Sequence, residues 1–544
     1  MTNHRGDNAS EAPKRKLIEV ALPLETINRE SAREKSIRHG HPSTLHLWWS
    51  RKPLATVRAV LFAQLVDDPS SHPDRFPTED TQRAERERLH QIIEQLVVWE
   101  NTRDKALLAE AHAEILRSTG GKPPPILDPF AGGATIPLEA QRLGLEAHAS
   151  DLNPVAVLIN KALVEIPPTF AGQPPVFPGL AESRIGDWEG ATGLAADVRA
   201  YGEWMRDEAE TRIGTHYPQA TLEHGTKATV IAWIWARAVT CPNPACGIEM
   251  PLTSKWWLGK KKGKEAWIRP LIVADSGHPS GKRVEFEIGH GMAGAGEDGT
   301  IGRNGATCLS CGAAVGLDYV RARSREVGLG AQLMAIATEG NRGRVYLPPN
   351  DEHRRAAEVP RPESAPEASL PTAAIGFRVQ NYGLTRWADL FTNRQLLALT
   401  TFSDLVIEAR ERVLSDALAI SIPQGDHVHA AGANAEAYAD AIATFLGMAV
   451  SRYANFMNAL CQWRPDAGKE QVGHLFSRQA IPMAWDFAEA NFESNSAGGW
   501  LPTLKFIPKA LEHLPFSASV GHASQADAAS ASALEAVIST DPPY

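Results

Sequence analysis

Residues 126–135, ILDPFAGGAT, constrain the fold of this chain more than any other stretch. Two aliphatic residues are followed there by an acid and then by a turn of small residues. Apolar residues at helical spacing follow, and Gly144 stands where a glycine commonly ends a helix. The pattern predicts a strand, a glycine turn and a helix, in that order. Glycines let a ligand approach the backbone closely, and the first turn of a helix offers free N–H groups.

A second short strand is expected at residues 146–150, and it ends at Asp151. Asp151 follows Gly132 by about 20 residues, the offset at which nucleotide-binding βαβ units place an acid on the ribose hydroxyls. Asn153 and Pro154 then open another helix, since proline is tolerated in the first turn. Together these segments predict an α/β fold.

The last four residues, DPPY, form a second part of the candidate site, because residues 536–538 before them have the pattern of a buried strand. Ligands of open α/β sheets bind at the carboxyl ends of such strands. An exocyclic amine on a base is a poor nucleophile and must be held close to its methyl donor. Asp541 can accept one amine hydrogen, the carbonyl oxygen of Pro542 can accept the other, and Tyr544 can stack on an extruded base.

These motifs give the chain a resemblance to the amino-methyltransferases that use S-adenosylmethionine. DPFAGGAT resembles their cofactor motif, SDLNP their acidic motif and DPPY their catalytic motif. The resemblance implies a Rossmann-like class I methyltransferase sheet that holds the cofactor through eight residues, namely Asp128, Pro129, Phe130, Ala131, Gly132, Gly133, Asp151 and Asn153. It also implies that four residues hold the target amine, namely Asp541, Pro542, Pro543 and Tyr544.

The order of the motifs resembles that of adenine methyltransferases, in which an insertion between the cofactor and catalytic motifs recognises the target. It implies methylation of N6 of a flipped adenine in double-stranded DNA, and the acid that opens DPPY favours adenine over cytosine. Amino-methylation of RNA, for example rRNA, stays open because similar DPPY loops serve there. A third interpretation is a non-catalytic zinc-ribbon subunit that binds DNA.

Residues 39–53 concentrate three histidines, two tryptophans and two cations in one block, HGHPSTLHLWWSRKP. The block is either a surface loop with its tryptophans in the core or a lip of the cofactor or base pocket. With the residues before it, from Lys16 on, it resembles the opening of DUF1156-type proteins, predicted adenine-specific DNA methylases that contain a zinc ribbon. That resemblance implies a role in a DNA modification or phage-defence locus.

Two pairs of cysteines, each followed by glycine, are candidate metal ligands: Cys241 with Cys246, and Cys308 with Cys311. Two such knuckles can supply four thiolates to a tetrahedral Zn²⁺, which then has no open position for catalysis. Cys461 is interpreted as a buried core thiol.

The arm between the knuckles interleaves basic and aromatic residues, which suits phosphate contact and base stacking. The candidate nucleic-acid residues are Lys255, Trp257, Lys260, Lys261, Lys262 and Lys264. The alternative is a solvated hairpin whose tryptophans cover a small core. Because the net charge is −9, any contact with nucleic acid must come from local basic patches of this kind.

The predicted organisation has seven parts. They are a disordered tail at 1–16, a helical region at 17–120 with two helices over 54–116, the first part of the cofactor domain at 121–228, the zinc-ribbon insertion at 229–347, a linker at 348–375, a mainly helical region proposed for target recognition at 376–500, and a return to the sheet at 501–544. No run of about 18 apolar residues occurs and the N-terminus lacks a signal sequence, so the cytoplasm is the expected location.

The chain stops directly after DPPY, whereas the amino-methyltransferases that it resembles continue with further strands and helices. The expectation is an incomplete sheet, cofactor binding weaker than in a longer enzyme, and little or no turnover by this chain alone. A complementing C-terminal chain or proteins of a defence locus are the expected partners.

Overall fold

The structure, a computed structural model, describes residues 14–183, 186–296, 298–341, 343–374, 376–420, 422, 434–477, 479–515, 520–530 and 535–541. The chain divides into two compact units, each containing helices and strands. The first combines Met1–Asp197, Asp416–Thr444 and Phe506–Tyr544, and the second combines Val198–Ser415 and Phe445–Lys505. Three of the four boundaries fall inside long helices, namely α8 (Thr192–Ile213), α11 (Asn393–Ala419) and α12 (Ala435–Ala454), and the fourth lies between α13 (Trp500–Leu504) and α14 (Phe506–Leu511).

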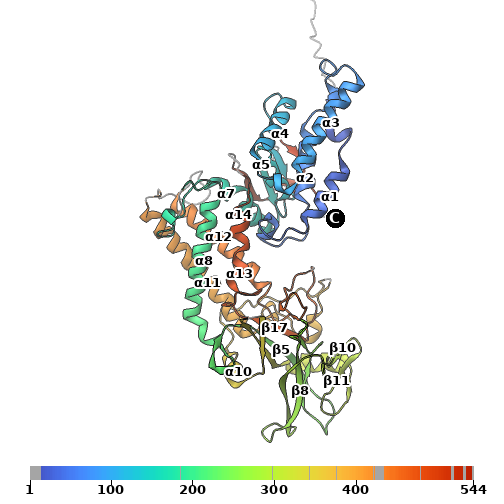
Figure 1. Cartoon of the computed structure of the whole chain (residues 1–544), viewed down its shortest axis with the longest axis vertical. Coiled ribbons are helices and arrows are strands. Elements are labelled where there is room, and N and C mark those ends of the chain that lie inside the picture. The colour runs from blue at the N-terminus through green and yellow to red at the C-terminus, as the bar shows by residue number, and fades with distance from the viewer. Residues whose placement is uncertain are drawn as a thin grey trace, which may run out of the picture. The chain divides into compact units, whose positions relative to one another are not determined.

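The N-terminal part of the first unit is made of helices that pack around one central helix, α2 (Figure 1). Its helices are α1 (Leu24–Glu34), α2 (Leu54–Leu65), α3 (Glu79–Leu96) and α4 (Lys105–Ser118). Most of α2 is buried, and α2 contacts the other three helices. The sequence predicted two helices where the structure has α2, α3 and α4. The side chain of Asp104 caps the extra helix by accepting the N–H groups of Ala106 and Leu107.

A four-stranded parallel sheet follows these helices in the first unit. Its strands are β1 (Ile126–Asp128), β2 (Ala147–Asp151), β18 (His522–Gln525) and β19 (Val537–Ile538), in the order β18-β2-β1-β19. Ile126 is in register with Val537 on one side and with Ala147 on the other. The predicted strands before the glycine turn, before Asp151 and before DPPY are therefore confirmed. Because the strands are parallel, their carboxyl ends share one edge of the sheet.

Helix α5 (Thr135–Arg142) follows the glycine turn, as predicted, and an enclosed ion network fixes it to α2. The Glu139 carboxylate accepts hydrogen bonds from Arg58 at 2.5 Å and from Arg142 at 3.0 Å, and all three side chains are buried. Arg142 also donates to the carbonyl oxygen of Thr102 at 2.7 Å. The middle and the end of α5 are thus held by the N-terminal region of the first unit.

Helix α6 (Pro154–Asn160) continues into a π-helical stretch, Lys161–Glu165, and then into α7 (Ile166–Thr169). The carbonyl oxygen of Val164 lacks the usual helical donor because Pro168, four residues later, has no N–H group, and it accepts the side chain of Gln141 at 2.8 Å and the N–H of Gly521 at 2.9 Å instead. Glu165 accepts the N–H of Ala523 at 3.1 Å. The π-helical stretch therefore anchors the segment that enters β18.

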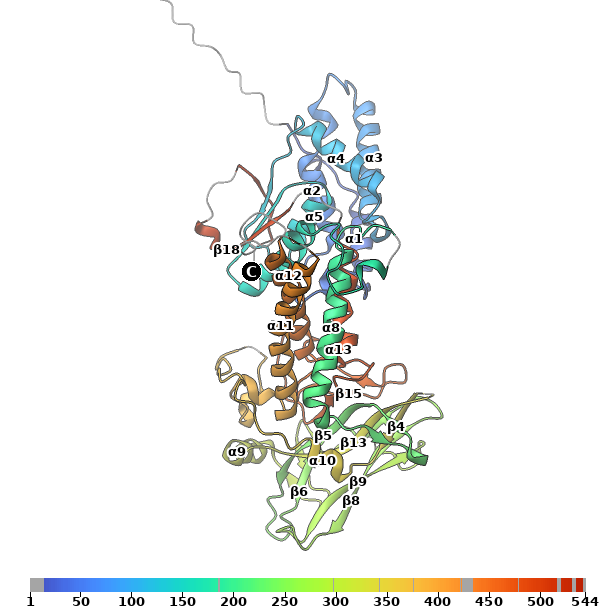
Figure 2. The same cartoon turned by 90° about the vertical axis from the view of Figure 1, so that its left-hand side faces the viewer.

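The second unit is built on an antiparallel sheet of β14 (Gly343–Leu347), β13 (Gly330–Gly340), β5 (Val230–Thr240) and β17 (Asp486–Ala490), with β6 (Glu249–Leu252) also paired to β5. A second sheet joins β7 (Trp257–Gly259), β8 (Ala266–Ala274) and β9 (Lys282–His290) (Figure 2). Buried Arg394 connects α11 to β17 through a 2.6 Å ion pair with Glu489. Among the helices that the structure describes, none combines the length and apolar character needed to cross a bilayer.

Candidate functional site

The glycine turn between β1 and α5 has an unusual backbone that is tied to both neighbouring segments. Gly132 and Ala134 have φ angles of 45° and 66°, in the left-handed region that a residue with a Cβ adopts at a cost. The N–H of Gly132 donates to Oδ2 of Asp151 at 2.9 Å, and the Asn160 side chain donates to the carbonyl oxygen of Gly132 at 3.1 Å. The turn is therefore fixed by the end of β2 and by α6.

Three carboxylates lie at the carboxyl edge of the sheet: Asp128 at the end of β1, Asp151 at the end of β2, and Asp541 in the loop after β19. Asp128 is buried and accepts the N–H of Phe130 at 3.1 Å and the hydroxyl of Thr540 at 2.9 Å. Burial, together with the nearby charges of Asp151 and Asp541, raises the pKa of Asp128 to about 6. The parallel sheet thus brings the predicted cofactor acid and the predicted catalytic acid together.

The other residues predicted to hold the cofactor surround this edge in different ways. Phe130 and the residue after Asp151, Leu152, expose 41% and 64% of their surface. Asn153 uses its side-chain oxygen to cap α6 through the N–H of Val155 at 2.9 Å. Ala131 is buried in a small apolar cluster between the turn and the sheet. Exposed apolar surface therefore borders the carboxylates, while Ala131 has a packing role.

Of the predicted catalytic tetrapeptide, Asp541 is described, and Pro542, Pro543 and Tyr544 lie outside the described residues. Asp541 forms a 2.7 Å ion pair with Lys52, and each side chain is 38% exposed. The positions predicted for the proline carbonyl and the tyrosine ring stay predictions from the sequence.

The block at residues 39–53 lies directly against the glycine turn. A Cβ placed on Gly132 would be 2.6 Å from Nε1 of Trp48, and one on Gly133 would be 2.8 Å from Cγ of Arg51. Arg51 donates from Nη1 to the carbonyl oxygen of Gly133 at 2.8 Å. The glycines are needed here so that these two side chains can approach the turn, a role that the sequence did not indicate. Trp49 is exposed, so it is not held in a core.

The same block is fixed near both of its ends. The Glu34 carboxylate accepts the N–H groups of Leu54 and Ala55 at 2.9 Å and 3.0 Å, at the start of α2. His41 contacts Glu34 at 2.9 Å and stacks on Trp99 with ring centroids 5.1 Å apart. Sequence reasoning missed Trp48, Arg51 and Lys52 as site residues, although it flagged the block for its aromatic and cationic content. Only the tertiary structure shows which of its side chains reach the turn.

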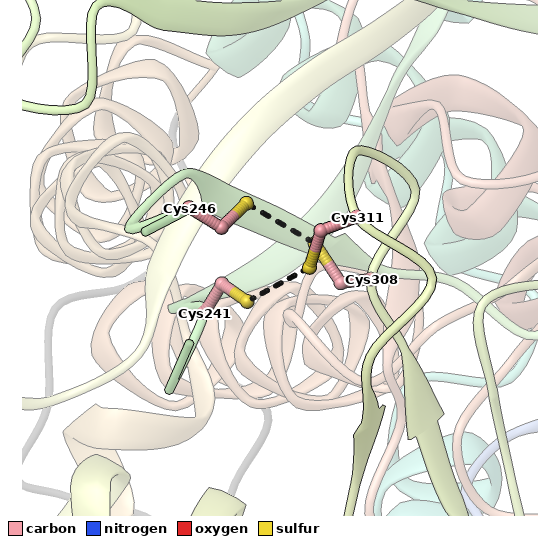
Figure 3. Close-up of side chains that lie close together, drawn as sticks. All are labelled: Cys241, Cys246, Cys308 and Cys311. Carbon is pink, nitrogen blue, oxygen red and sulfur yellow. Dashed lines mark hydrogen bonds between the residues drawn. The ribbon is translucent and has the colours of Figure 1, made fainter. Parts of the chain in front are cut away.

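The four predicted metal ligands lie together in the second unit (Figure 3). The Sγ atoms of Cys241 and Cys311 are 3.7 Å apart, those of Cys246 and Cys308 are 3.9 Å apart, and all four lie within 4.8 Å of one another. Disulfide sulfurs would be about 2.05 Å apart, whereas thiolates about 2.3 Å from a tetrahedral zinc lie about 3.8 Å apart. The cluster can therefore hold a metal ion, as the sequence predicted.

Each cysteine pair lies in a turn that directs both thiols to one side. The N–H of Cys246 donates to the carbonyl oxygen of Asn243 at 2.9 Å, and that of Cys308 to Ala313 at 2.9 Å. The glycine after each knuckle, Gly247 or Gly312, has a left-handed backbone, which explains its presence there. Cys461 is buried outside the cluster, so its predicted place in the core is confirmed.

In the arm between the two cysteine pairs, the lysine and tryptophan side chains differ in their exposure to solvent. Four lysines are exposed around the turn between β7 and β8, namely Lys260, Lys261, Lys262 and Lys264, and Lys255 is partly exposed. Three tryptophans of the arm are buried, namely Trp256, Trp257 and Trp267. Trp257 is only 8% exposed, and Nζ of Lys260 lies 5.3 Å from its ring centroid. The base-stacking role predicted for Trp257 does not fit this burial, because a stacking ring needs an accessible face. The exposed lysines remain candidates for phosphate contact.

Comparison with known proteins gives one match. The family model described as "Protein of unknown function (DUF1156)" matches residues 21–92. That stretch contains α1, α2, most of α3 and the block that lies against the glycine turn. No curated protein and no solved structure matches the chain. The similarity to DUF1156 therefore covers α1, α2, most of α3 and the block with Arg51 and Lys52, and it stops before α4 and the glycine turn.

Proposed function

We propose that this chain is an S-adenosylmethionine-dependent methyltransferase that acts on N6 of adenine in DNA. The observation that carries the proposal is the arrangement of the parallel sheet. In chain order its strands lie third, second, first, fourth, which matches the first four positions of the Rossmann strand order 3-2-1-4-5-6. That order gathers the glycine turn, Asp151 and Asp541 at one edge, the edge where such sheets bind ligands.

The cofactor supplies a methyl group on a positively charged sulfonium, and this edge has groups that suit its other parts. Asp151 ends β2, where an acid can accept both ribose hydroxyls. Phe130 and Leu152 expose apolar surface suited to a flat purine ring. Oδ1 of Asn160 is buried next to Gly132 without a hydrogen-bond partner, which supports a ligand near the turn.

Asp541 has the chemistry needed to hold the target amine. Its carboxylate can accept one amine hydrogen and so turn the nitrogen lone pair toward the methyl group. The hydroxyl of Thr540, the neighbouring residue, donates to Asp128 at 2.9 Å, which fixes the start of the loop that carries Asp541. An adenine can reach Asp541 only when it is flipped out of the duplex.

The second unit fits a structural zinc site and a phosphate-binding surface. Four thiolates at tetrahedral spacing suit Zn²⁺ and leave it no open position, so the metal would stabilise the fold without reacting. The exposed lysines at 260–264 would contact the DNA backbone and contribute affinity without reading the sequence.

Cofactor binding and methyl transfer test the proposal separately. Calorimetry with S-adenosylhomocysteine is expected to give saturable binding at one site. Labelled S-adenosylmethionine, with the protein in excess over adenine-containing duplex DNA, is expected to give methyl transfer that Asp541→Ala lowers at least 100-fold. Asp80→Ala, at an exposed acid on α3, is the matched control.

Three results would count against the proposal. If the protein does not bind the cofactor, the methyltransferase assignment is wrong. If it transfers methyl groups to RNA but not to DNA, the substrate is RNA and the DNA assignment is wrong. Unchanged methyl transfer in Asp541→Ala would exclude Asp541 as the residue that holds the amine, and unchanged biological activity in this variant would favour a non-catalytic DNA-binding subunit.

A further inference from the structure

Beside the glycine turn, Arg51 is a cation that forms no ion pair with any carboxylate among the described residues. Its Nη1 donates to the carbonyl oxygen of Gly133 at 2.8 Å and its Nη2 to that of His46 at 3.2 Å. Nε is enclosed and has no hydrogen-bond partner. Within the part of the chain that the structure describes, no carboxylate forms an ion pair with this guanidinium.

In contrast to Arg51, other cations of the first unit have their charge neutralised by carboxylates. Lys52 pairs with Asp541, and Arg58 and Arg142 share Glu139. Burial lowers the pKa of Arg51 to about 10, so the group still carries its charge at neutral pH. Carbonyl oxygens orient a guanidinium but do not neutralise it, and an enclosed charge without a counter-ion is costly. The position of Arg51 therefore favours a negatively charged ligand.

We infer that Arg51 binds the carboxylate at the amino-acid end of the cofactor, an assignment that rests on the proposed function. A guanidinium presents paired N–H donors that match the two oxygens of a carboxylate. The first turn of α5 begins directly after Gly133 and Ala134, and its free N–H groups and dipole favour an anion at the same place. With the ribose on Asp151, the amino-acid end of the ligand extends toward this turn, whose backbone Arg51 contacts.

Two ligands test whether Arg51 contacts the carboxylate of the cofactor or affects binding of the whole ligand. S-adenosylhomocysteine carries the amino-acid carboxylate, and 5′-methylthioadenosine has the same nucleoside without it. Calorimetry on the full chain is expected to show that Arg51→Met weakens S-adenosylhomocysteine binding at least 10-fold and 5′-methylthioadenosine binding less than 2-fold. Arg51→Lys, which keeps the charge but loses the paired donors, is expected to fall between Arg51→Met and the wild type. Lys122→Met, at an exposed lysine before β1, is the control and should match the wild type for both ligands.

The outcomes distinguish the two proposals. If the wild type binds neither ligand, the cofactor site itself is wrong and this role fails with it. If the wild type binds both ligands and Arg51→Met weakens both equally, Arg51 only shapes the turn. If Arg51→Met weakens neither, Arg51 does not contact the ligand. Retained 5′-methylthioadenosine binding also shows that a variant is folded.

Discussion

Asp128 shows how a single buried acid connects the two halves of the candidate site. It lies at the end of β1, yet its oxygen accepts a hydrogen bond from Thr540, which is 412 residues away in the sequence. Its burial and the two nearby carboxylates make ionisation unfavourable and raise its pKa to about 6 from an ordinary value of 3.8. Its proton is therefore coupled to the stability of the first unit.

Asp128→Asn should stabilise the protein more at pH 7.5 than at pH 4.5. Between pH 3.8 and about 6 the folded state binds more protons at this site than the unfolded state, so stability falls as pH rises through that window. The loss reaches about 3 kcal/mol above the window. Asparagine removes this dependence and still offers an oxygen to the N–H of Phe130 and to Thr540. Thermal unfolding at both pH values measures the difference, with exposed Asp80→Asn as the control. An equal effect at both pH values would contradict the assignment.

At the scale of elements, the sequence predicted those strands, turns and helices whose signal lies within a short stretch of the chain. The β1 strand, the glycine turn, α5 and β2 follow one another, and each has its own apolar spacing, glycine or proline. Strand β18 was not predicted, because residues 522–525 (HASQ) carry no strong apolar pattern. It forms because the exposed edge of β2 and the carbonyl oxygen of Val164 accept a segment that comes much later in the chain. Parallel pairing of this kind leaves no local signal.

The cysteine cluster was predictable for a different reason. Each knuckle carries its own turn chemistry, so only the distance between the knuckles had to be supplied by the fold. The burial of Trp257 was not predictable in the same way, because basic and aromatic residues interleave both in binding arms and in hairpins that cover a core. Which of the two applies depends on the packing of β7, β8 and β9.

Metal content should follow the four clustered cysteines and not the fifth. Purified protein is expected to hold about one zinc ion per chain by elemental analysis, and Cys308→Ser should remove most of it. A chelator should then lower the unfolding temperature of the wild type, because binding free energy of a structural metal adds to folding. Cys461→Ala, at a buried thiol outside the cluster, should keep its zinc. Full metal content in Cys308→Ser would exclude the site.

For the whole molecule, charge is distributed unevenly. The chain has a net charge of −9, yet Lys260, Lys261, Lys262 and Lys264 lie exposed around one turn. Changing the four to alanine should weaken binding of duplex DNA for every sequence alike. It should also reduce the slope of log affinity against log salt by up to about 3.6, at roughly 0.9 for each of four phosphate contacts. Fluorescence anisotropy over a salt series measures both quantities.

The buried tryptophan supplies the control for that experiment. Trp257→Phe should leave the affinity and the salt slope unchanged, because the ring is enclosed and does not meet a base. An unchanged slope in the four-lysine variant would place the DNA contact elsewhere. A weakened affinity in Trp257→Phe with the fold intact would restore the stacking role.

The strand order β18-β2-β1-β19 also has a consequence for synthesis on the ribosome. The first two strands emerge early and keep both edges open while the whole second unit is translated. Nascent chains with open edges attract chaperones and pair wrongly with one another. A ribosome stalled before codon 522 should therefore carry a protease-sensitive N-terminal half, and one stalled on an extension added after residue 544, long enough for both late strands to clear the exit tunnel, should carry a resistant one.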